Sequence, residues 1–148
     1  ARDLTLDSGS ATITITGAIG ATNALDVITI TQSGGTTFTG AVNADTVTLT
    51  DTTGNVTFAG NTTLTTLNTA SQDYNVIFNG STNTITNAVT FSNTGSLTFG
   101  NASGDSSTFN GGLTTTAPSQ INLGGTEKYY HQIFLVFSLF QIDLNISY

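Results

Sequence analysis

Short segments in which apolar residues alternate with polar ones recur along the chain. Their apolar members are mostly Ile, Val, Leu or Phe and their polar members are mostly Thr, which is the period-two pattern of a half-buried β-strand. One series comprises residues 13–15, 36–38, 56–58, 76–78, 97–99 and 121–123, whose last apolar residues lie 20 to 24 positions apart. The sequence is therefore built from a repeat of about twenty residues.

A second series of segments lies half a repeat away and interleaves with the first without a gap. It comprises residues 4–6, 28–30, 47–49, 65–67, 89–91 and 113–115. Turn-forming Gly, Asn and Asp residues separate the segments, and a weaker third strand follows some of the glycines, as at Ile19 and Val42. Two or three short strands per repeat predict one coil of a solenoid, in which neighbouring coils hydrogen-bond to one another at a rise of about 4.8 Å.

These patterns predict an all-β protein: a parallel β-helix (β-solenoid) of about six ~20-residue coils in residues 1–126, followed by an atypical C-terminal strand. A β-sandwich or jelly roll also uses short strands, but neither gives a reason for equivalent strands to recur at a fixed spacing. Inward-facing apolar columns would form the core of the solenoid. The predicted core residues are Ile15, Ile30, Phe38, Leu49, Phe58, Phe78, Phe91, Phe99 and Leu123.

Two segments resemble a known family: ADTVTLT at residues 44–50 and GNVTFAGN at residues 54–61. They are similar to the β-strand repeats of large bacterial surface proteins, namely filamentous-haemagglutinin-type adhesins and autotransporter passenger domains. The resemblance covers roughly residues 3–126. It implies a right-handed parallel β-helix that is exported and is extracellular or exposed on a bacterial cell surface.

The composition changes at Glu127, after which Gly and Thr are absent and Phe and Leu concentrate. Residues 127–148 therefore form a separate apolar segment, and residues 140–148 alternate strictly, as in a half-buried strand. We interpret this segment as a cap on the open solenoid end or as an assembly strand that adds to a neighbour's sheet. A shifted reading frame and a terminal strand like those of outer-membrane proteins are the alternatives. The residues predicted to make the assembly contact are Ile133, Phe134, Phe137, Phe140, Ile142, Leu144, Ile146 and Tyr148.

The composition excludes several classes of protein. Thr (32), Gly (16), Asn (14) and Ser (13) make up about half of the 148 residues, and only 7% are charged. The formal net charge is −7, and the two cations, Arg2 and Lys128, are too few for a nucleic-acid surface. We expect no transmembrane helix, because no stretch of about 18 apolar residues occurs. The absence of Cys excludes disulfides and thiolate metal sites, and the start at Ala1, without Met or a signal peptide, predicts a processed or excerpted chain.

Side chains that carry chemistry are sparse. His131 is the only histidine, which excludes a His-based triad or a multi-histidine metal site within one chain. Asp26 and Asp45 precede equivalent strands and Asp51 closes the following turn; paired carboxylates are what a polysaccharide-cleaving enzyme needs. We interpret these three as solvated turn residues, because the cations lie at the chain termini. We therefore predict no catalytic residue, no cofactor and no metal site, and a protein that is not an enzyme.

Outward-facing threonines are the other regular feature. T-x-T pairs that would stack into ladders occur at Thr14/Thr16, Thr29/Thr31 and Thr48/Thr50. Such pairs resemble the arrays of ice-binding solenoids, although Asn68 and Ser92 interrupt the column and Thr is also a good exposed strand residue.

Together, the repeats and the missing chemistry predict a structural extracellular protein, either a self-assembling fibre subunit or a surface adhesin module. Its predicted partners are further copies of itself, joined through the solenoid ends and the C-terminal strand, and a host or matrix glycan or protein. An ice-binding solenoid and a polysaccharide-active β-helix enzyme are the alternative hypotheses.

Overall fold

The computed structural model describes residues 2–129, and every regular element in that range is a β-strand. Sheet A contains, in spatial order, β1 (Asp3–Asp7), β3 (Leu25–Ser33), β5 (Val42–Thr52), β7 (Thr62–Thr69), β9 (Thr82–Ile85), β12 (Ser106–Phe109) and β15 (Thr126–Tyr129). Sheet B contains β2 (Ile13–Ile15), β4 (Thr36–Phe38), β6 (Asn55–Phe58), β8 (Asn75–Phe78), β11 (Ser96–Phe99) and β14 (Gln120–Leu123). Sheet C pairs β10 (Val89–Thr90) with β13 (Leu113–Thr114). This part of the chain contains no helix that could cross a membrane.

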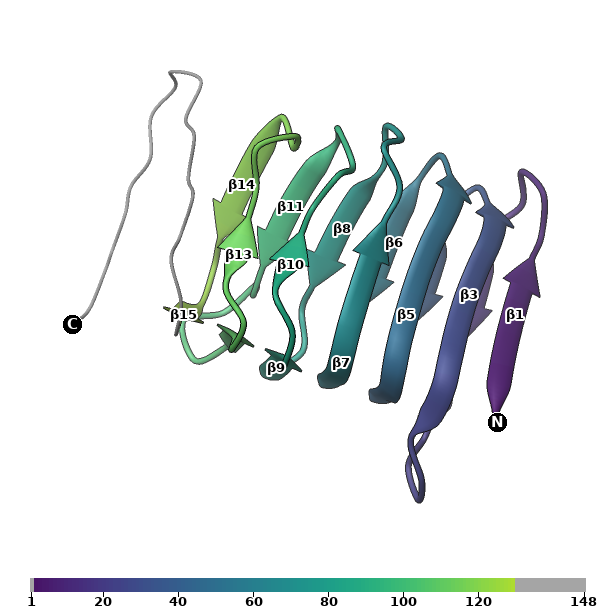
Figure 1. Ribbon diagram of the computed structural model, residues 1–148, viewed down its shortest axis with the longest axis horizontal. Helices are drawn as coiled ribbons and strands as arrows, with labels where there is room; N and C mark the ends of the chain where they lie inside the picture. Colours follow the sequence, from purple (N-terminus) through teal and green to yellow (C-terminus); the bar gives the residue numbers. More distant parts are fainter. Residues whose placement is uncertain (1, 130–148) are drawn as a thin grey trace.

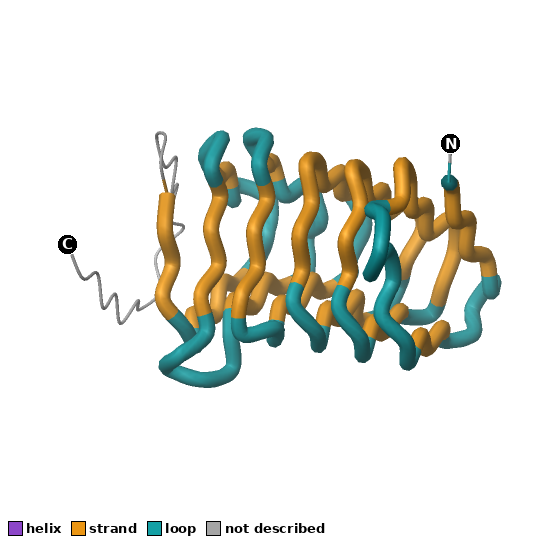
Figure 2. The backbone as a smooth tube through the Cα atoms, turned by 90° about the horizontal axis from the view of Figure 1, so that it is seen from below, coloured by secondary structure: helices purple, strands orange, loops and turns teal. Residues whose placement is uncertain are grey.

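Each coil runs along sheet A, turns, and returns along sheet B before the next coil begins (Figures 1 and 2). The strand pairs are parallel and join successive coils of about 21 residues. In Figure 1 the chain ascends the front sheet, descends the rear sheet and advances from β1 at the right to β15 at the left, which is a right-handed winding. The protein is thus a parallel β-solenoid of about six turns. This confirms the predicted fold, and the parallel pairing excludes the β-sandwich.

In the middle coils, one sheet-A strand contains two of the predicted strand segments. β5 begins at Val42, in the weak third segment, and continues through the second-series segment at residues 47–49. The alternation of buried and outward residues shifts by one where Asp45 and Thr46 follow each other, so the strand bends there. In two later coils the same path is divided into β9 and β10, or β12 and β13. The third strand expected after the glycines is therefore the first half of the bent strands β5 and β7, and it is a separate strand, β9 or β12, in the two later coils. At Ile19 it is reduced to an isolated bridge with Val42.

Strand pairing continues past the predicted boundary between residues 126 and 127. β15 pairs with β12 in register, so that Thr126 lies opposite Ser106 and Tyr129 lies opposite Phe109. The first residues of the apolar segment therefore extend the solenoid, because backbone pairing does not require the Thr- and Gly-rich composition of the earlier coils.

A stack of phenylalanine rings forms the centre of the core. The ring centroids of Phe38 and Phe58 are 5.1 Å apart and those of Phe58 and Phe78 are 4.9 Å apart, with interplanar angles of 12° and 6°. Phe99 continues the stack at 5.9 Å from Phe78. The spacing follows the distance between paired strands, about 4.8 Å, so the backbone pairing itself places the rings in contact. At the far end Phe109 meets Phe99 edge to face, with centroids 5.2 Å apart.

The predicted core residues lie on the inward faces of the strands. Those that are fully buried are Ile30, Phe38, Leu49, Phe58, Phe78, Phe91 and Phe99. Ile15 is half-buried and packs against the core from the first coil. Leu123 differs from the prediction, because 40% of its surface is exposed. It faces the same column as Phe99 but lies in β14, which has a strand neighbour on one side only among the described residues.

Glycines allow successive coils to approach closely at the corner that follows sheet B. Gly40, Gly60 and Gly80 stand at this corner after β4, β6 and β8. A Cβ atom on Gly60 would lie 2.5 Å from the carbonyl carbon and 2.6 Å from the carbonyl oxygen of Gly40, and one on Gly80 would lie 2.4 Å from the oxygen of Gly60. No side chain fits at these positions, which explains the regular glycine spacing in the sequence.

Replacing Phe58 by Ala should lower the free energy of unfolding by about 4 kcal/mol, because the substitution leaves a cavity between two stacked rings. Thr57→Ala, on the outward face of the same strand, should change it by less than about 0.5 kcal/mol. Urea unfolding followed by circular dichroism measures both. Equal losses in the two variants would contradict an inward-facing ring stack.

Gly60→Ala should destabilise the protein by about 3 kcal/mol through the clash with the Gly40 backbone. Gly104→Ala is the matched control, because a Cβ there would meet nothing within 4 Å, and we expect it to unfold at the wild-type urea concentration. If Gly60→Ala also unfolds at that concentration, the coils are not in backbone contact at this corner.

Candidate functional site

The outer face of sheet B carries no charged residue, and equivalent positions form a column across the coils. The strand register places in this column Thr14, Thr37, Thr57, Ile77, Thr98 and Asn122. The side-chain amide of Asn122 donates a hydrogen bond to Thr98 Oγ1 at 3.3 Å. Ile77 interrupts the run of hydroxyl groups, so the face is a mixed polar surface and not a continuous threonine ladder.

Threonines also stack on sheet A. The register places Thr5, Thr29 and Thr48 in one column, followed by Asn68, whose amide donates to Thr48 Oγ1 at 3.3 Å. The structure therefore brings Thr29 and Thr48 of the predicted T-x-T pairs together, and Asn68 ends this hydroxyl series as the sequence indicates. Thr14, from the third predicted pair, lies on sheet B and not in this column. Ice binding by these residues stays a prediction.

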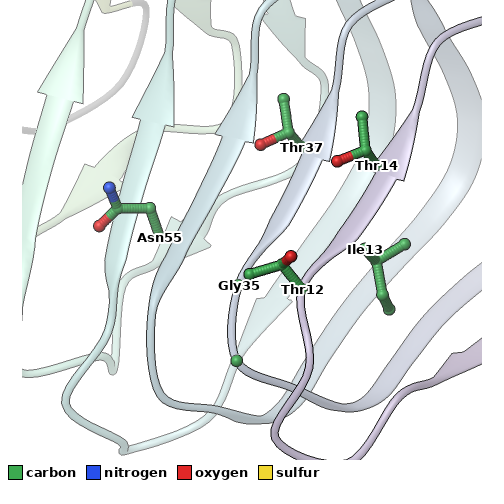
Figure 3. A pocket seen from close by; sticks show the side chains of 7 residues that line it. Thr12, Ile13, Thr14, Gly35, Thr37 and Asn55 are labelled. Carbon is green, nitrogen blue, oxygen red and sulfur yellow. The ribbon is translucent and has the colours of Figure 1, made fainter.

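A shallow hollow of about 330 Å³ lies on the outer face near the N-terminal end of sheet B (Figure 3). Its lining residues are Thr12, Ile13, Thr14, Gly34, Gly35, Thr37 and Asn55. In the strand register Gly35 lies between Thr12 of the preceding coil and Asn55 of the following coil, and its φ of +138° favours glycine. A Cβ atom at Gly35 would lie 3.1 Å from the backbone oxygen of Asn55. Hydroxyl and amide groups line this hollow without any ionisable side chain. It can exchange hydrogen bonds with a neutral polar ligand but offers no acid or base for catalysis.

Asparagine side chains link successive coils at the start of sheet B. Asn75 Nδ2 donates to Asn55 Oδ1 at 2.8 Å, and Asn75 Oδ1 accepts from the backbone N and the Oγ of Ser96 at 2.7 and 2.8 Å. One amide thus uses its donor toward the preceding coil and its acceptor toward the following coil. The role of Asn55 and Asn75 is structural. Their spacing of twenty residues at equivalent strand starts is the sequence signal for it.

The pairing of β3 with β5 brings two of the predicted acidic residues together. Asp26 and Asp45 occupy equivalent positions in adjacent strands, since Leu25 pairs with Ala44 and Val27 with Thr46. Asp26 accepts a hydrogen bond from the backbone N of Arg2 at 3.1 Å, while Asp45 is exposed.

Asp51, the third predicted turn acid, accepts a hydrogen bond from Gln32 Nε2 at 3.2 Å. Within residues 2–129, no three His, Cys, Asp or Glu side chains come together in a way that could hold a metal ion. All three acids lie within strands, Asp26 in β3 and Asp45 and Asp51 in β5, so their interpretation as turn residues is wrong. Only Asp45 is exposed, whereas Asp26 and Asp51 are half-buried.

Two ionisable residues have environments that the sequence did not indicate. Asp105 is 7% exposed and caps its own turn, accepting from the backbone N of Asn101 and Ala102 at 2.8 and 2.9 Å. Tyr74 is 1% exposed. Burial raises the pKa of its phenol to about 12, and the nearby Ala70 backbone and Thr69 side chain counter this only in part. An Asp followed by Ser is typical of a turn in which the Asp side chain bonds to the backbone, so the sequence around Asp105 indicates its role. No local feature of the sequence indicates that Tyr74 is buried.

The first coil leaves strand edges without a partner among the described residues. β1 and β2 are the outermost strands of sheets A and B, and each pairs on one side only. The inward-facing Leu4, Leu6 and Ile15 are half-buried there, although the residues beside them in the next coil are fully buried. This end therefore combines unpaired backbone groups with incompletely covered apolar columns, the features of a surface that pairs with a further strand.

The eight residues predicted to make an assembly contact, from Ile133 to Tyr148, lie outside the described residues, as does His131. No family model, curated protein or solved structure matches this chain. Within residues 2–129, three features have functional potential: the uncharged outer face of sheet B with its hollow, the incompletely paired first coil, and the incompletely paired strands β13, β14 and β15 at the other end.

The buried Tyr74 phenol predicts a specific alkaline transition. The folded-state pKa of about 12 exceeds the unfolded value of about 10. The unfolded state therefore loses its proton first, and the free energy of unfolding falls as the pH rises from about 10 to 12. Tyr74→Phe should show a shallower fall over that range and a stability at pH 7 within about 1 kcal/mol of wild type. Urea unfolding between pH 7 and 11.5 tests this, and identical slopes would show that the phenol ionises equally in both states.

Proposed function

We propose that this chain is a structural module of an extracellular fibre or surface adhesin, in which protomers associate end to end through the solenoid ends and the segment 127–148. The observation that carries the proposal is the first coil, where two unpaired strand edges coincide with half-buried inward residues. A further coil placed against β1 and β2 would complete both the hydrogen bonds and the apolar columns.

A second copy of this chain is the partner that fits this end best. All sheet-A strands run in one direction and all sheet-B strands in the other, so the opposite end of another copy presents strands of the correct polarity. At that opposite end, Ile121 and Leu123 of β14 are equivalent to Ile13 and Ile15 of β2 in their columns. Such head-to-tail contacts do not close on themselves and so build a filament.

An adhesin module is the second form of the same proposal. The hollow on sheet B offers hydroxyl and amide groups without charge, which suits hydrogen bonding to a neutral glycan or to a peptide backbone of a host or matrix protein. The extracellular or bacterial cell-surface location rests on the resemblance of residues 44–50 and 54–61 to surface-protein repeats.

Ile15→Lys tests end-to-end association in the full chain. An inward-pointing charge at the uncovered end of the phenylalanine column would be buried by a docked copy, so we expect filaments seen by negative-stain electron microscopy to disappear. Thr14→Lys adds the same charge to the outward face of the same strand and should leave the filaments intact. Circular dichroism and thermal unfolding check that both variants remain folded.

Two results would count against the fibre form. If the wild-type protein is a discrete monomeric rod by light scattering at all accessible concentrations, the adhesin form is retained and the fibre form is abandoned. If both lysine variants assemble as well as the wild type, the filament contact lies elsewhere than at β2.

A further inference from the structure

The C-terminal end of the described solenoid exposes apolar side chains beside unpaired strand edges. Leu123 is 40% exposed, whereas Phe99, its neighbour in the same column, is fully buried. Ile121 is half-buried, although its neighbour Leu97 is fully buried. β13, β14 and β15 each pair with one strand only among the described residues. We refer to the surface formed by these three strands as the C-terminal edge.

The length of chain that follows this edge suits one further coil. A coil takes about 21 residues, and the coil that opens with β15 at Thr126 would therefore end near residue 146. The chain continues to Tyr148. The residues from Thr126 to Tyr148 are thus enough to complete this coil.

The sequence beyond β15 repeats the pattern of the strand that needs a partner. β14 reads Gln-Ile-Asn-Leu at residues 120–123, and residues 141–144 read Gln-Ile-Asp-Leu, 21 positions later. The step from β8 to β11 is also 21 positions. This register places Ile142 beside Ile121 and Leu144 beside Leu123, the two side chains that the described coils leave uncovered.

The spacing between sheet-A and sheet-C strands within a coil independently aligns the C-terminal segment with sheet C. β10 begins seven residues after the start of β9, and β13 begins seven residues after the start of β12. Seven residues after the start of β15 stands Ile133. Its counterparts in the two preceding coils, Val89 and Leu113, are apolar and buried.

We propose that the C-terminal edge is the docking surface for residues 133–144 of this same chain, which add a seventh coil to the solenoid. Residues 141–144 pair in parallel with β14, and Ile133 adds to the column of Val89 and Leu113. Leu144 covers Leu123, and Asp143 stands on the outer face beside Asn122. This docking lies within one molecule. In a fibre, the seventh coil and not β14 would then meet the first coil of the next copy.

Engineered disulfides test this register in the full chain, which contains no native cysteine. Asn122→Cys combined with Asp143→Cys places two thiols on directly opposite residues of neighbouring strands, about 4.8 Å apart at Cα, within the range that a disulfide spans. After mild oxidation of a dilute sample, intact mass and peptide mapping under non-reducing conditions should show a disulfide between positions 122 and 143 within one chain. The substitutions face outward, so they leave the apolar columns unchanged.

The matched control combines Asn122→Cys with Asn145→Cys. Residue 145 lies on the same face but one diagonal step away, roughly 7–8 Å in this register, and we expect the disulfide to be lost. Equal crosslinking of the two pairs would overturn the register and the proposal with it.

A mixture of the two single-cysteine proteins identifies the occupant. If positions 122 and 143 join only between two copies, the edge accepts a neighbour's C-terminal segment and the intramolecular docking is wrong. If they join neither within nor between copies, the seventh coil is wrong as well. Each outcome is read on crosslinked species, so it is separate from the filament test made with Ile15→Lys.

Discussion

Parallel pairing of each coil with the next is the constraint on which the rest of this structure depends. It places every residue about 4.8 Å from the equivalent residue of the neighbouring coil, so each position must tolerate a similar side chain directly beside it. Phenyl rings meet this requirement by stacking, as Phe58 does between Phe38 and Phe78. Side-chain amides meet it by donating in one direction and accepting in the other, as Asn75 does. Like charges that lie side by side repel each other, and the chain is only 7% charged, with Asp26 and Asp45 as one pair of like charges at equivalent positions.

The same pairing also determines where the solenoid is incomplete. A residue in a middle coil has a neighbour on both sides, and Ile30, Leu49 and Phe58 are accordingly buried. A residue in a terminal coil has one neighbour, which leaves Ile15 half-buried and Leu123 exposed at opposite ends. The ends therefore carry both the unsatisfied backbone groups and the uncovered apolar surface. This is why the proposals on assembly and on the C-terminal segment concern the ends and not the faces.

The faces contribute a different kind of surface. Along sheet B the outward side chains are uncharged, and several of their polar groups already hydrogen-bond to neighbouring coils. A surface of this kind can contact a neutral partner without assisting a proton transfer. The hollow beside Gly35 lies on this face, and no ionisable side chain lines it.

The sequence by itself determined the repeat length, the strand positions and most of the inward residues. Strand positions and inward residues follow from the local alternation of apolar and polar residues, and the repeat length follows from the constant spacing between stacked coils. For this reason Phe38, Phe58 and Phe78 were identifiable as core residues. The equivalent placement of Asp26 and Asp45 was identifiable for the same reason, although both lie within strands and not in the predicted turns.

Only the tertiary structure decided features that depend on contacts with residues at other positions of the repeat or at the ends of the solenoid. The bend at Asp45 and Thr46 joins two predicted strands into one, which the alternation alone does not reveal. The burial of Tyr74, and with it the raised pKa, depends on chain segments packed around a single residue. The exposure of Leu123 depends on what lies beyond β14 and not on its own alternating pattern, because that pattern shows which way a side chain faces but not whether another coil covers it.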